Sequence, residues 1–177
     1  MKSTKSAGRY AKALLELATE QQKLQVVESN MERVLKTAED NYDFQVFLNS
    51  PVINQDKKIS VLNEIFKDFD QLTLAFFKLM TNNRRESLIL EIAHAFLAQL
   101  KEMKGIVPIS IASARQLDAS TRQKIVDKIS ASVKGSLEIT EIIDEKLIGG
   151  FVVRMGDKQI DASVAAQLKR MKQELTK

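Results

Sequence analysis

Few residues of this chain belong to the types that carry catalysis or bind metal ions. His94 is the only histidine among 177 residues, cysteine is absent, and His94 lies between two alanines in an apolar helical pattern. A metal centre or a catalytic triad needs several such groups at one place, so a lone histidine lacks the partners for either. We therefore expect a structural histidine, no catalytic or metal-binding residue, and no cofactor.

Two other motifs have the residue types of known sites but not their context. Gly149-Gly150 stands before an apolar strand, whereas a phosphate-binding loop needs a following Lys-Ser or Lys-Thr and a helix N-terminus. Asp144-Glu145 is a carboxylate pair in a predicted turn, without an apolar pocket that would tune it for acid–base catalysis. We expect a backbone role for the glycines and no catalytic role for the carboxylates.

The stretch that follows these glycines predicts a strand, a turn and a helix. Residues 151–155 alternate in the period of a half-buried strand, Gly156-Asp157 is typical of a tight turn, and Gln159-Ile160 can return as a partner strand. We expect Asp161 to cap a helix that begins near Ala162. The apolar stripe of this helix consists of Val164, Leu168, Met171 and Leu175. Part of that stripe should pack on the sheet.

The first 105 residues instead repeat the apolar period of amphipathic helices. Six helices are expected, with breaks at polar clusters and at Ser50-Pro51. Ser6 is the expected N-cap of the first helix, and Asp70 that of the fifth. We expect Lys57-Lys58 to be exposed on the fourth helix. The sixth should begin near Glu86, face Met103 inward and end at Gly105.

After Gly105 the apolar period changes from helical to alternating. The strand from Val107 to Ile111 contains Pro108, which favours a sheet edge or the first residues of a strand. Asp118 should cap a helix whose apolar residues are Ile125, Val126, Ile129 and Val133. A further strand starts near Leu137, with a bulge or its end at Ile142-Ile143. The expected fold is mainly α, with an N-terminal six-helix bundle (1–105) and a small α+β domain with a mixed sheet (106–177).

Charge and hydropathy narrow the function classes. The formal net charge is +4, from 27 Lys and Arg against 23 Asp and Glu, and the charges are interspersed along helices. No run of eighteen apolar residues and no secretory signal pattern is present, so we expect a cytosolic or peripheral protein without direct membrane insertion. Three functions compete: a two-domain connector that binds one helix with each domain, a basic helical adaptor or nucleic-acid-binding protein, and an enzyme. The amphipathic stripes favour the connector, since no Lys/Arg stripe with interleaved aromatics and no set of convergent titratable groups is found.

Three motifs together resemble one known family. They are GGFVVRMGDKQIDASV at residues 149–164, Arg9–Leu14 (RYAKAL), and Asn83-Arg84-Arg85 with Phe96 further on. In this order they are similar to the delta subunit of F-type ATP synthases, the family of the oligomycin-sensitivity-conferring protein. Members often have glycine where this chain has Arg84 and Ala162, so the turn before the sixth helix and the last helix cap can differ.

The resemblance implies a non-catalytic stator subunit that functions in ATP synthesis and hydrogen ion transport. It would tie the catalytic head to the peripheral stalk, as a monomer within the complex, at the cytoplasmic side of the bacterial inner membrane. In that family the N-terminal bundle binds the N-terminal helix of an alpha subunit in a groove between the first and fifth helices. The C-terminal domain holds the end of the b subunit.

Two sets of residues are the expected partner sites. For the alpha subunit, the small Ala13 and Ala75 would let a helix approach, and the larger residues lining the groove would be Tyr10, Leu14, Leu17, Leu72 and Leu79. For the b subunit, the stripe Val164, Leu168, Met171 and Leu175 would be buried, flanked by Lys169, Arg170 and Lys172. Basic flanks would attract carboxylates of the b helix.

Overall fold

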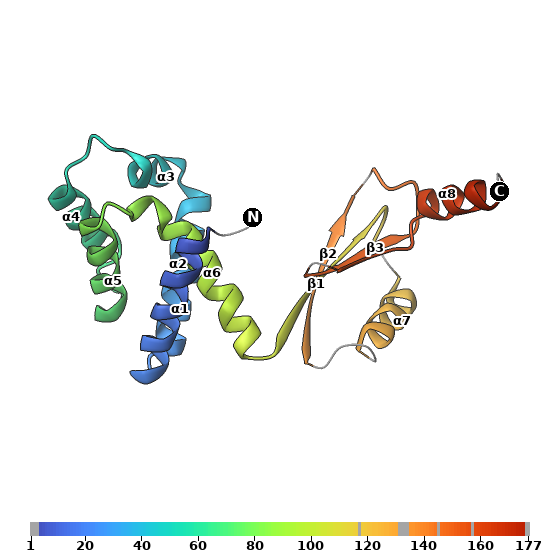
Figure 1. Cartoon of the computed structure of the whole chain (residues 1–177), viewed down its shortest axis with the longest axis horizontal. Coiled ribbons are helices and arrows are strands. Elements are labelled where there is room, and N and C mark those ends of the chain that lie inside the picture. The colour runs from blue at the N-terminus through green and yellow to red at the C-terminus, as the bar shows by residue number, and fades with distance from the viewer. Residues whose placement is uncertain (1–3, 117, 131–134, 145, 157, 176–177) are drawn as a thin grey trace. The chain divides into compact units, whose positions relative to one another are not determined.

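The computed structural model describes residues 4–175 apart from 117, 131–134, 145 and 157 (Figure 1). The chain divides into two compact units, Met1–Leu100 and Lys101–Lys177. The expected fold class is confirmed, since six α-helices precede a mixed four-stranded sheet with helices. Whether each unit folds alone, and whether the domain boundary is Gly105, stay predictions.

The first unit is helical throughout its regular elements. These are α1 (Lys5–Glu20), α2 (Leu24–Asp40), α3 (Tyr42–Asn49), α4 (Gln55–Ile65), α5 (Gln71–Asn82), the 3-10 turn η1 (Glu86–Leu88) and α6 (Ile89–Met103), which continues into the second unit. The cap predicted for α5 is confirmed, because Asp70 Oδ1 accepts a hydrogen bond from Leu72 N at 2.9 Å. The cap predicted for α1 is wrong. Thr4 takes that place, its Oγ1 accepting from Ala7 N at 3.2 Å, and Ser6 lies inside the helix.

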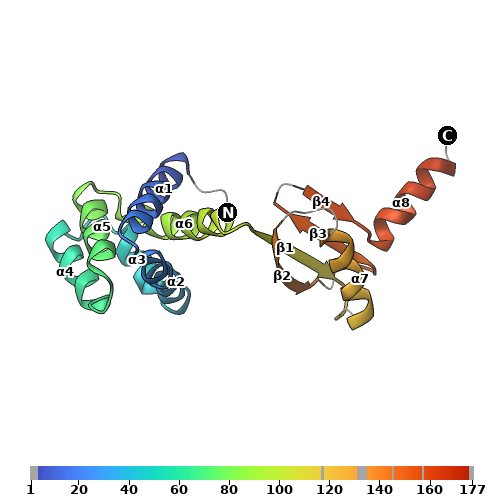
Figure 2. The ribbon, with the colours of Figure 1, turned by 90° about the horizontal axis from the view of Figure 1, so that it is seen from below.

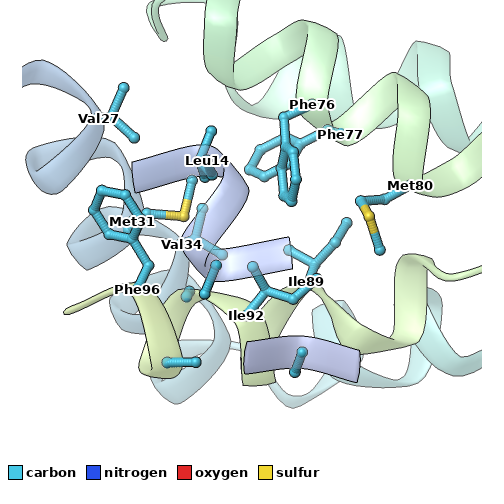
Figure 3. Close-up of a cluster of buried hydrophobic side chains, with 14 of the residues drawn as sticks. Leu14, Val27, Met31, Val34, Phe76, Phe77, Met80, Ile89, Ile92 and Phe96 are labelled. Atoms are coloured by element: carbon cyan, nitrogen blue, oxygen red, sulfur yellow. The ribbon is translucent and has the colours of Figure 1, made fainter. Parts of the chain in front are cut away.

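Apolar residues from all six helices meet in one core. Figure 3 shows members of this core from α1, α2, α5 and α6. Leu14 of α1, Met31 of α2 and Phe77 of α5 are among its fully buried members. The ring of Phe66 contacts three others, lying 4.5 Å from Phe69 and 5.7 Å from both Phe44 and Phe77 between centroids. Contacts between aromatic rings stabilise a core by more than the apolar area that the rings bury. These rings therefore fix the packing at the centre of this unit.

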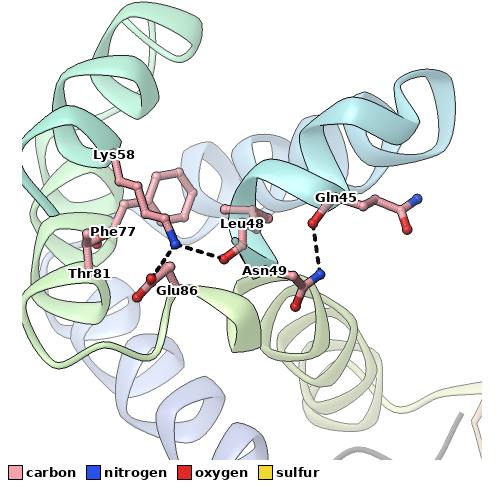
Figure 4. Close-up of polar contacts among 7 residues, drawn as sticks. All are labelled: Gln45, Leu48, Asn49, Lys58, Phe77, Thr81 and Glu86. Atoms are coloured by element: carbon pink, nitrogen blue, oxygen red, sulfur yellow. Dashed lines mark hydrogen bonds and ion pairs between the residues drawn. The ribbon is translucent and has the colours of Figure 1, made fainter. Parts of the chain in front are cut away.

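Lys58 of α4 is buried, contrary to the prediction that it is exposed. Its side chain is 2% exposed, and Nζ donates to Leu48 O at 3.2 Å and to Glu86 Oε1 at 2.5 Å (Figure 4). A buried ammonium group is tolerated only where such acceptors compensate for lost water. The apolar stripe of α4 could not reveal these acceptors, because they come from α3 and η1. Lys57 is exposed, as expected.

The inward orientation expected for Met103 is also wrong. Leu100 is the last buried residue of α6, and Met103, in the final turn, is half exposed. Gly105 follows with φ of +66°, the left-handed conformation expected at the end of this helix.

The second unit contains the sheet. Its elements are β1 (Ile106–Ser113), α7 (Ala119–Ser130), β2 (Ser136–Ile143), β3 (Phe151–Met155), β4 (Lys158–Asp161) and α8 (Val164–Leu175). The strand order is β2-β1-β3-β4, with β1 parallel to β2 and antiparallel to β3, and β3 antiparallel to β4 (Figure 2). In the register of the β3–β4 pair Met155 is opposite Lys158, which is the hairpin expected around Gly156-Asp157; Asp157 itself lies outside the described residues.

The register of the strand pairs decides two questions that the sequence left open, the place of Pro108 in the sheet and the break at Ile142-Ile143. Pro108 is the third residue of β1, a central strand, and it precedes the ladder with β3, which begins at Ile109. The reading as the start of a strand is therefore right and the sheet edge wrong. β2 pairs without interruption up to Ile143 opposite Ser113, so the slip at Ile142-Ile143 marks the strand end, not a bulge.

One face of the sheet carries the core of this unit. Asp118 Oδ2 accepts from Thr121 N at 3.0 Å and caps α7 as predicted. The buried cluster consists of Ile109, Ile111, Ile125, Ile129 and Val153. α7 therefore covers this face mainly through Ile125 and Ile129, while Val133, predicted to join them, lies outside the described residues.

The predicted start and cap of α8 are wrong by two residues. Ser163 Oγ accepts from Ala166 N at 3.2 Å, so Ser163 caps a helix that begins at Val164. Asp161 instead ends β4, and its Oδ1 accepts from Ser163 N at 2.9 Å. Throughout the described part of the chain, no helix has both the length and the apolarity needed to cross a bilayer.

Candidate functional site

The groups considered for catalysis do not converge. His94 lies on the exposed side of α6, and the described residues contain no cluster of His, Asp and Glu that could hold a metal ion. Asp144 accepts a hydrogen bond from Lys146 N within its turn, while Glu145 lies outside the described residues. The candidate sites are therefore surfaces.

Gly150 has the backbone role predicted for it. Its φ is +79°, and a Cβ there would lie 2.4 Å from Ala162 O, while a Cβ on Gly149 would lie 3.1 Å from the side chain of Val164. Both glycines thus let the chain before β3 pass close to the chain before α8. Val164 N also donates to Gly149 O at 3.0 Å, which ties the start of α8 to this point.

The residues predicted to bind an alpha subunit divide between surface and core. Leu17 and Leu79 are 44% and 50% exposed, and Ala13 and Ala75 are exposed as well. Leu14 is 1% exposed and lies in the core beside Phe76 and Phe77, so it supports the surface from below (Figure 3). Tyr10 and Leu72 are partly buried against the same core.

A contact at the end of this surface was not predicted. Arg85 Nη1 donates to Tyr10 Oη at 3.2 Å, and the guanidinium carbon lies 5.6 Å from the centroid of the Tyr10 ring. The preceding Arg84 has φ of +55°, a conformation that glycine adopts with less strain. The chain thus turns sharply between α5 and η1, and this turn places the Arg85 guanidinium against Tyr10 of α1. Tyr10 and Arg85 stand in two of the three motifs that carry the family resemblance, but the spacing of these motifs gives no sign of a contact.

The described residues of the α8 stripe are Val164, Leu168 and Met171, and all three are exposed, so none of them packs on the sheet as expected. Leu168 and Met171 are 58% and 57% exposed, Val164 lies beside Gly149 in the turn before β3, and no described α8 residue belongs to the buried cluster. The stripe stays exposed because α8 extends away from the end of β4 instead of returning across the sheet (Figure 2). The side chain of Leu175 lies outside the described residues.

The basic flank of α8 is exposed at Lys169, Arg170 and Lys172. Arg170 Nη2 donates to Asp161 O at 3.5 Å, which links the helix to the end of β4. Hydrogen bonds from Ser163, and to a lesser degree the charge of Arg170, lower the pKa of Asp161. The carboxylate is therefore ionised near neutral pH and offsets part of the positive charge at the start of α8.

A groove that the sequence did not reveal lies between α7 and the β3–β4 hairpin. Its volume is about 460 Å³. It is lined by Thr121, Lys124, Ile125, Ile129, Phe151, Val153, Met155, Lys158, Ile160 and Ala162. The sequence contained one sign of this groove. A two-residue turn at Gly156-Asp157 places Ile160 opposite Val153, on the same face of the sheet as the core.

Comparisons with known proteins agree on one family. The family model described as "ATP synthase delta (OSCP) subunit" matches residues 7–175. A protein of Christiangramia forsetii named ATP synthase subunit delta is 34% identical over 175 residues, which cover 99% of this chain and 95% of that one. The ATP synthase subunit delta of Cytophaga hutchinsonii is also 34% identical, over 99% of this chain and 97% of its own.

A solved structure extends the similarity to the fold. One chain in the cryo-EM structure of the Toxoplasma gondii mitochondrial ATP synthase hexamer aligns with a TM-score of 0.75 at 26% identity. The alignment covers 98% of this chain and 99% of that chain. Sequence and fold are therefore similar over nearly the whole length.

Proposed function

This chain belongs to the ATP synthase delta (OSCP) subunit family, whose members are non-catalytic stator components of the F-type ATP synthase, and from this premise we propose that it joins two partners. The first unit would hold the N-terminal helix of an alpha subunit, and the second unit the end of a b subunit of the peripheral stalk. In this role the chain is a monomer within the complex, peripheral to the membrane, and its work is mechanical.

One observation carries this proposal: each compact unit presents exposed apolar side chains on a helix. Leu17 and Leu79 do so in the first unit, and Leu168 and Met171 in the second. Helices recognise partner helices by such rows of apolar residues, and the interaction needs no catalytic group. Two separate surfaces, one on each unit, are what a connector requires.

The alpha-subunit half of the proposal is tested with a peptide of the alpha N-terminal helix. Ala13→Arg and Ala75→Arg should abolish peptide binding, because a long charged side chain occupies the space of a methyl group on the contact surface. Ala98→Arg, at an exposed alanine of α6 outside this surface, is the matched control. Circular dichroism must show a folded bundle in all three. Unchanged affinity in the α1 and α5 variants would move the alpha site elsewhere.

The b-subunit half is tested by truncation after Ala162. The shortened protein should still bind the alpha peptide but lose the b subunit, and it should uncouple ATP hydrolysis from proton pumping in reconstituted membranes. Reversal of charge at Lys169, Arg170 and Lys172 should act more mildly, at most about 1 kcal/mol per charge, because exposed charges are screened. Full b binding by the truncated protein would refute the role of α8.

A further inference from the structure

The short helix α3 carries apolar residues on both of its sides. Phe44 and Leu48 are buried in the core of the first unit, whereas Tyr42 and Val46, which lie one turn apart, are 75% and 48% exposed. A hollow of about 460 Å³ lies against this outer side. Exposed apolar side chains beside a hollow are typical of places where a partner docks. The lining of the hollow, here named the α3 surface, consists of Tyr42, Gln45, Val46, Asn49, Ser50 and Pro51.

Hydrogen bonds hold the α3 surface in place. Gln45 Nε2 donates to Ala38 O near the end of α2 at 2.6 Å. Asn49 Nδ2 donates to Gln45 O at 2.8 Å, and the buried Lys58 donates to Leu48 O at the end of the same helix (Figure 4). A surface that is already ordered loses little conformational entropy when a partner binds, so the α3 surface is preorganised for docking.

The charges beside the α3 surface have one sign. Residues 38–54 contain three charged side chains, those of Glu39, Asp40 and Asp43, and all three are exposed. This stretch is therefore acidic, although the formal net charge of the whole chain is +4. Opposite charge on a partner steers its approach and fixes its register. A complementary occupant of the α3 surface carries Lys or Arg beside its apolar residues.

The acidic border is unfavourable for several classes of occupant. Anionic lipid headgroups and the phosphates of nucleic acid would be repelled by the three carboxylates. A helix with carboxylates on its flanks, such as the one proposed above to meet the basic flank of α8, would be repelled for the same reason. A protein helix with basic flanks is the class that fits both the apolar residues and the charge.

A second copy of this chain has a helix of this kind but is an unsuitable occupant. Helix α8 carries Lys169 and Arg170 beside the exposed Leu168 and Met171. A contact between α8 of one copy and α3 of the next joins two different surfaces, so it would build rings or open chains of copies. The proposed function requires a monomer within the complex.

We propose that the α3 surface is a docking site for an amphipathic helix with Lys or Arg on its flanks, supplied by another protein. Apolar residues one turn apart on this helix would contact Tyr42 and Val46, and its cations would face Glu39, Asp40 and Asp43. The inference goes beyond the proposed function, because it adds a contact of the first unit that is separate from the residues expected to bind the alpha subunit.

The test uses a synthetic helical peptide with leucine at positions i, i+4 and i+7 and lysine beside them, and measures its binding to the full-length protein by fluorescence anisotropy. Val46→Arg should weaken binding about tenfold or more, because it places a cation on the apolar part of the surface. Val26→Arg is the matched control, since Val26 is 49% exposed on α2 and is not part of the α3 surface. It should change affinity by less than about twofold. An unchanged Tm and circular dichroism spectrum establish folding of both variants.

A second pair of variants isolates the charge. Asp43→Asn should lower the association rate and flatten its salt dependence, whereas Asp68→Asn, at an exposed carboxylate outside the α3 surface, should do neither. The same peptide with glutamate in place of lysine should bind more weakly than the lysine peptide. Equal effects of the two variants, or equal binding of the two peptides, would overturn the assignment of a basic partner.

The remaining outcomes decide the location and the occupant. Binding of the lysine peptide that is lost only in Val46→Arg supports the inference. No binding by the wild type, or equal binding by wild type and Val46→Arg, overturns it. Competition between the alpha-subunit peptide and the lysine peptide, with loss of both in Val46→Arg, would make the α3 surface part of the alpha site and overturn a separate contact. Self-association of the wild type that Val46→Arg abolishes would assign the surface to a second copy and overturn the inference.

Failure of this inference is distinguishable from failure of the proposed function. The alpha-subunit half of that function depends on Ala13 and Ala75, and its b-subunit half depends on α8. An alpha peptide that does not bind would refute the first half without changing the expected binding of the lysine peptide. Loss of lysine-peptide binding in Val46→Arg with retained binding of the alpha peptide shows that the two surfaces are separate.

Discussion

The two units of this chain bury their apolar residues to different extents. In the first unit, residues of six helices share one core, and six phenylalanine rings belong to it within the described part of the chain. In the second unit the buried cluster contains five of the described residues, while apolar side chains remain exposed on the two edge strands, β2 and β4, and along α8. Exposed apolar residues of the second unit include Ile142, Ile143, Ile148, Ile160, Leu168 and Met171.

This difference teaches how a stator subunit built from two units can differ in stability between them. Burial of apolar area is the dominant favourable term in folding, so a unit with many buried side chains can be stable without a partner. A unit with a small buried cluster obtains a larger share of its stability when a partner covers its exposed apolar area. We expect the first unit to be the stable support and the second to gain most from assembly.

The largest effect is expected when the units are separated. A fragment ending at Lys104 should be helical and unfold in one cooperative thermal transition, because its core is complete without the sheet. A fragment of residues 106–177 should unfold at lower temperature and bind a dye specific for exposed apolar surface. Calorimetry of both fragments measures this. A more stable C-terminal fragment would reverse the comparison.

Lys58→Met should destabilise the first unit by about 3–5 kcal/mol, because the Glu86 carboxylate is then left largely buried without its partner. Glu86 Oε2 already has no hydrogen-bond partner among the described groups, so Oε1 would join it. Lys57→Met, at the exposed neighbour, should change stability by no more than about 0.5 kcal/mol. Urea unfolding measures both, and equal costs would show that the buried pair has no special role.

Gly150→Ala should destabilise the second unit by about 2–3 kcal/mol, since it adds backbone strain and the new Cβ would overlap Ala162 O. Gly105→Ala is a matched substitution, because φ there is +66° but no atom lies within 4 Å of the added Cβ. It should cost only about 1 kcal/mol. The unfolding transition of the second unit measures the loss of stability in both variants. Equal losses would show that only the backbone conformation matters and that the overlap with Ala162 O does not.

Asp70→Ala should have the smallest effect, about 1 kcal/mol at neutral pH, through loss of the α5 cap. The hydrogen bond from Leu72 N, and then Lys23, lower the pKa of Asp70 below its ordinary value of 3.8. The folded state therefore favours the ionised carboxylate. Its stabilisation is complete above pH 3.8 and is lost as pH falls through the lower pKa of the folded state.

Urea unfolding at neutral pH and in acid measures this dependence on Asp70. The difference between wild type and Asp70→Ala should shrink in acid. Asp68→Ala, at an exposed carboxylate just before the cap, provides the baseline. A difference that grows in acid would contradict the assigned direction of the pKa shift.

Local patterns predicted the elements of this fold well. The change of period after Gly105, the caps at Asp70 and Asp118, and the hairpin around Gly156-Asp157 depend on neighbours in sequence, so the sequence contains the needed information. The N-caps of α1 and α8 were misplaced by two residues. Thr4 and Ser6, like Asp161 and Ser163, are all good capping types, and tertiary contacts decide between them.

Features that depend on distant residues escaped prediction. Lys58 is buried because Leu48 O and Glu86 accept from it, and neither is related to α4 by periodicity. The exposure of α8 depends on the direction in which it leaves β4. The groove depends on how much of the sheet α7 covers. The sequence identified the apolar stripes that contain the predicted partner residues. It could not show that Leu14 is buried in the core while Leu17 is exposed on the surface.

The position of β1 has a mechanical consequence. Only Lys104 and Gly105 separate the end of α6 from Ile106, so a pull arriving from the first unit enters a strand that lies between β2 and β3. The hydrogen bonds of both ladders run across the direction of that pull, and force along β1 loads them together instead of opening them one after another. A tether anchored in the middle of a sheet resists shear better than one attached to an edge hairpin, which suits a stator that must withstand torque at every turn of the rotor.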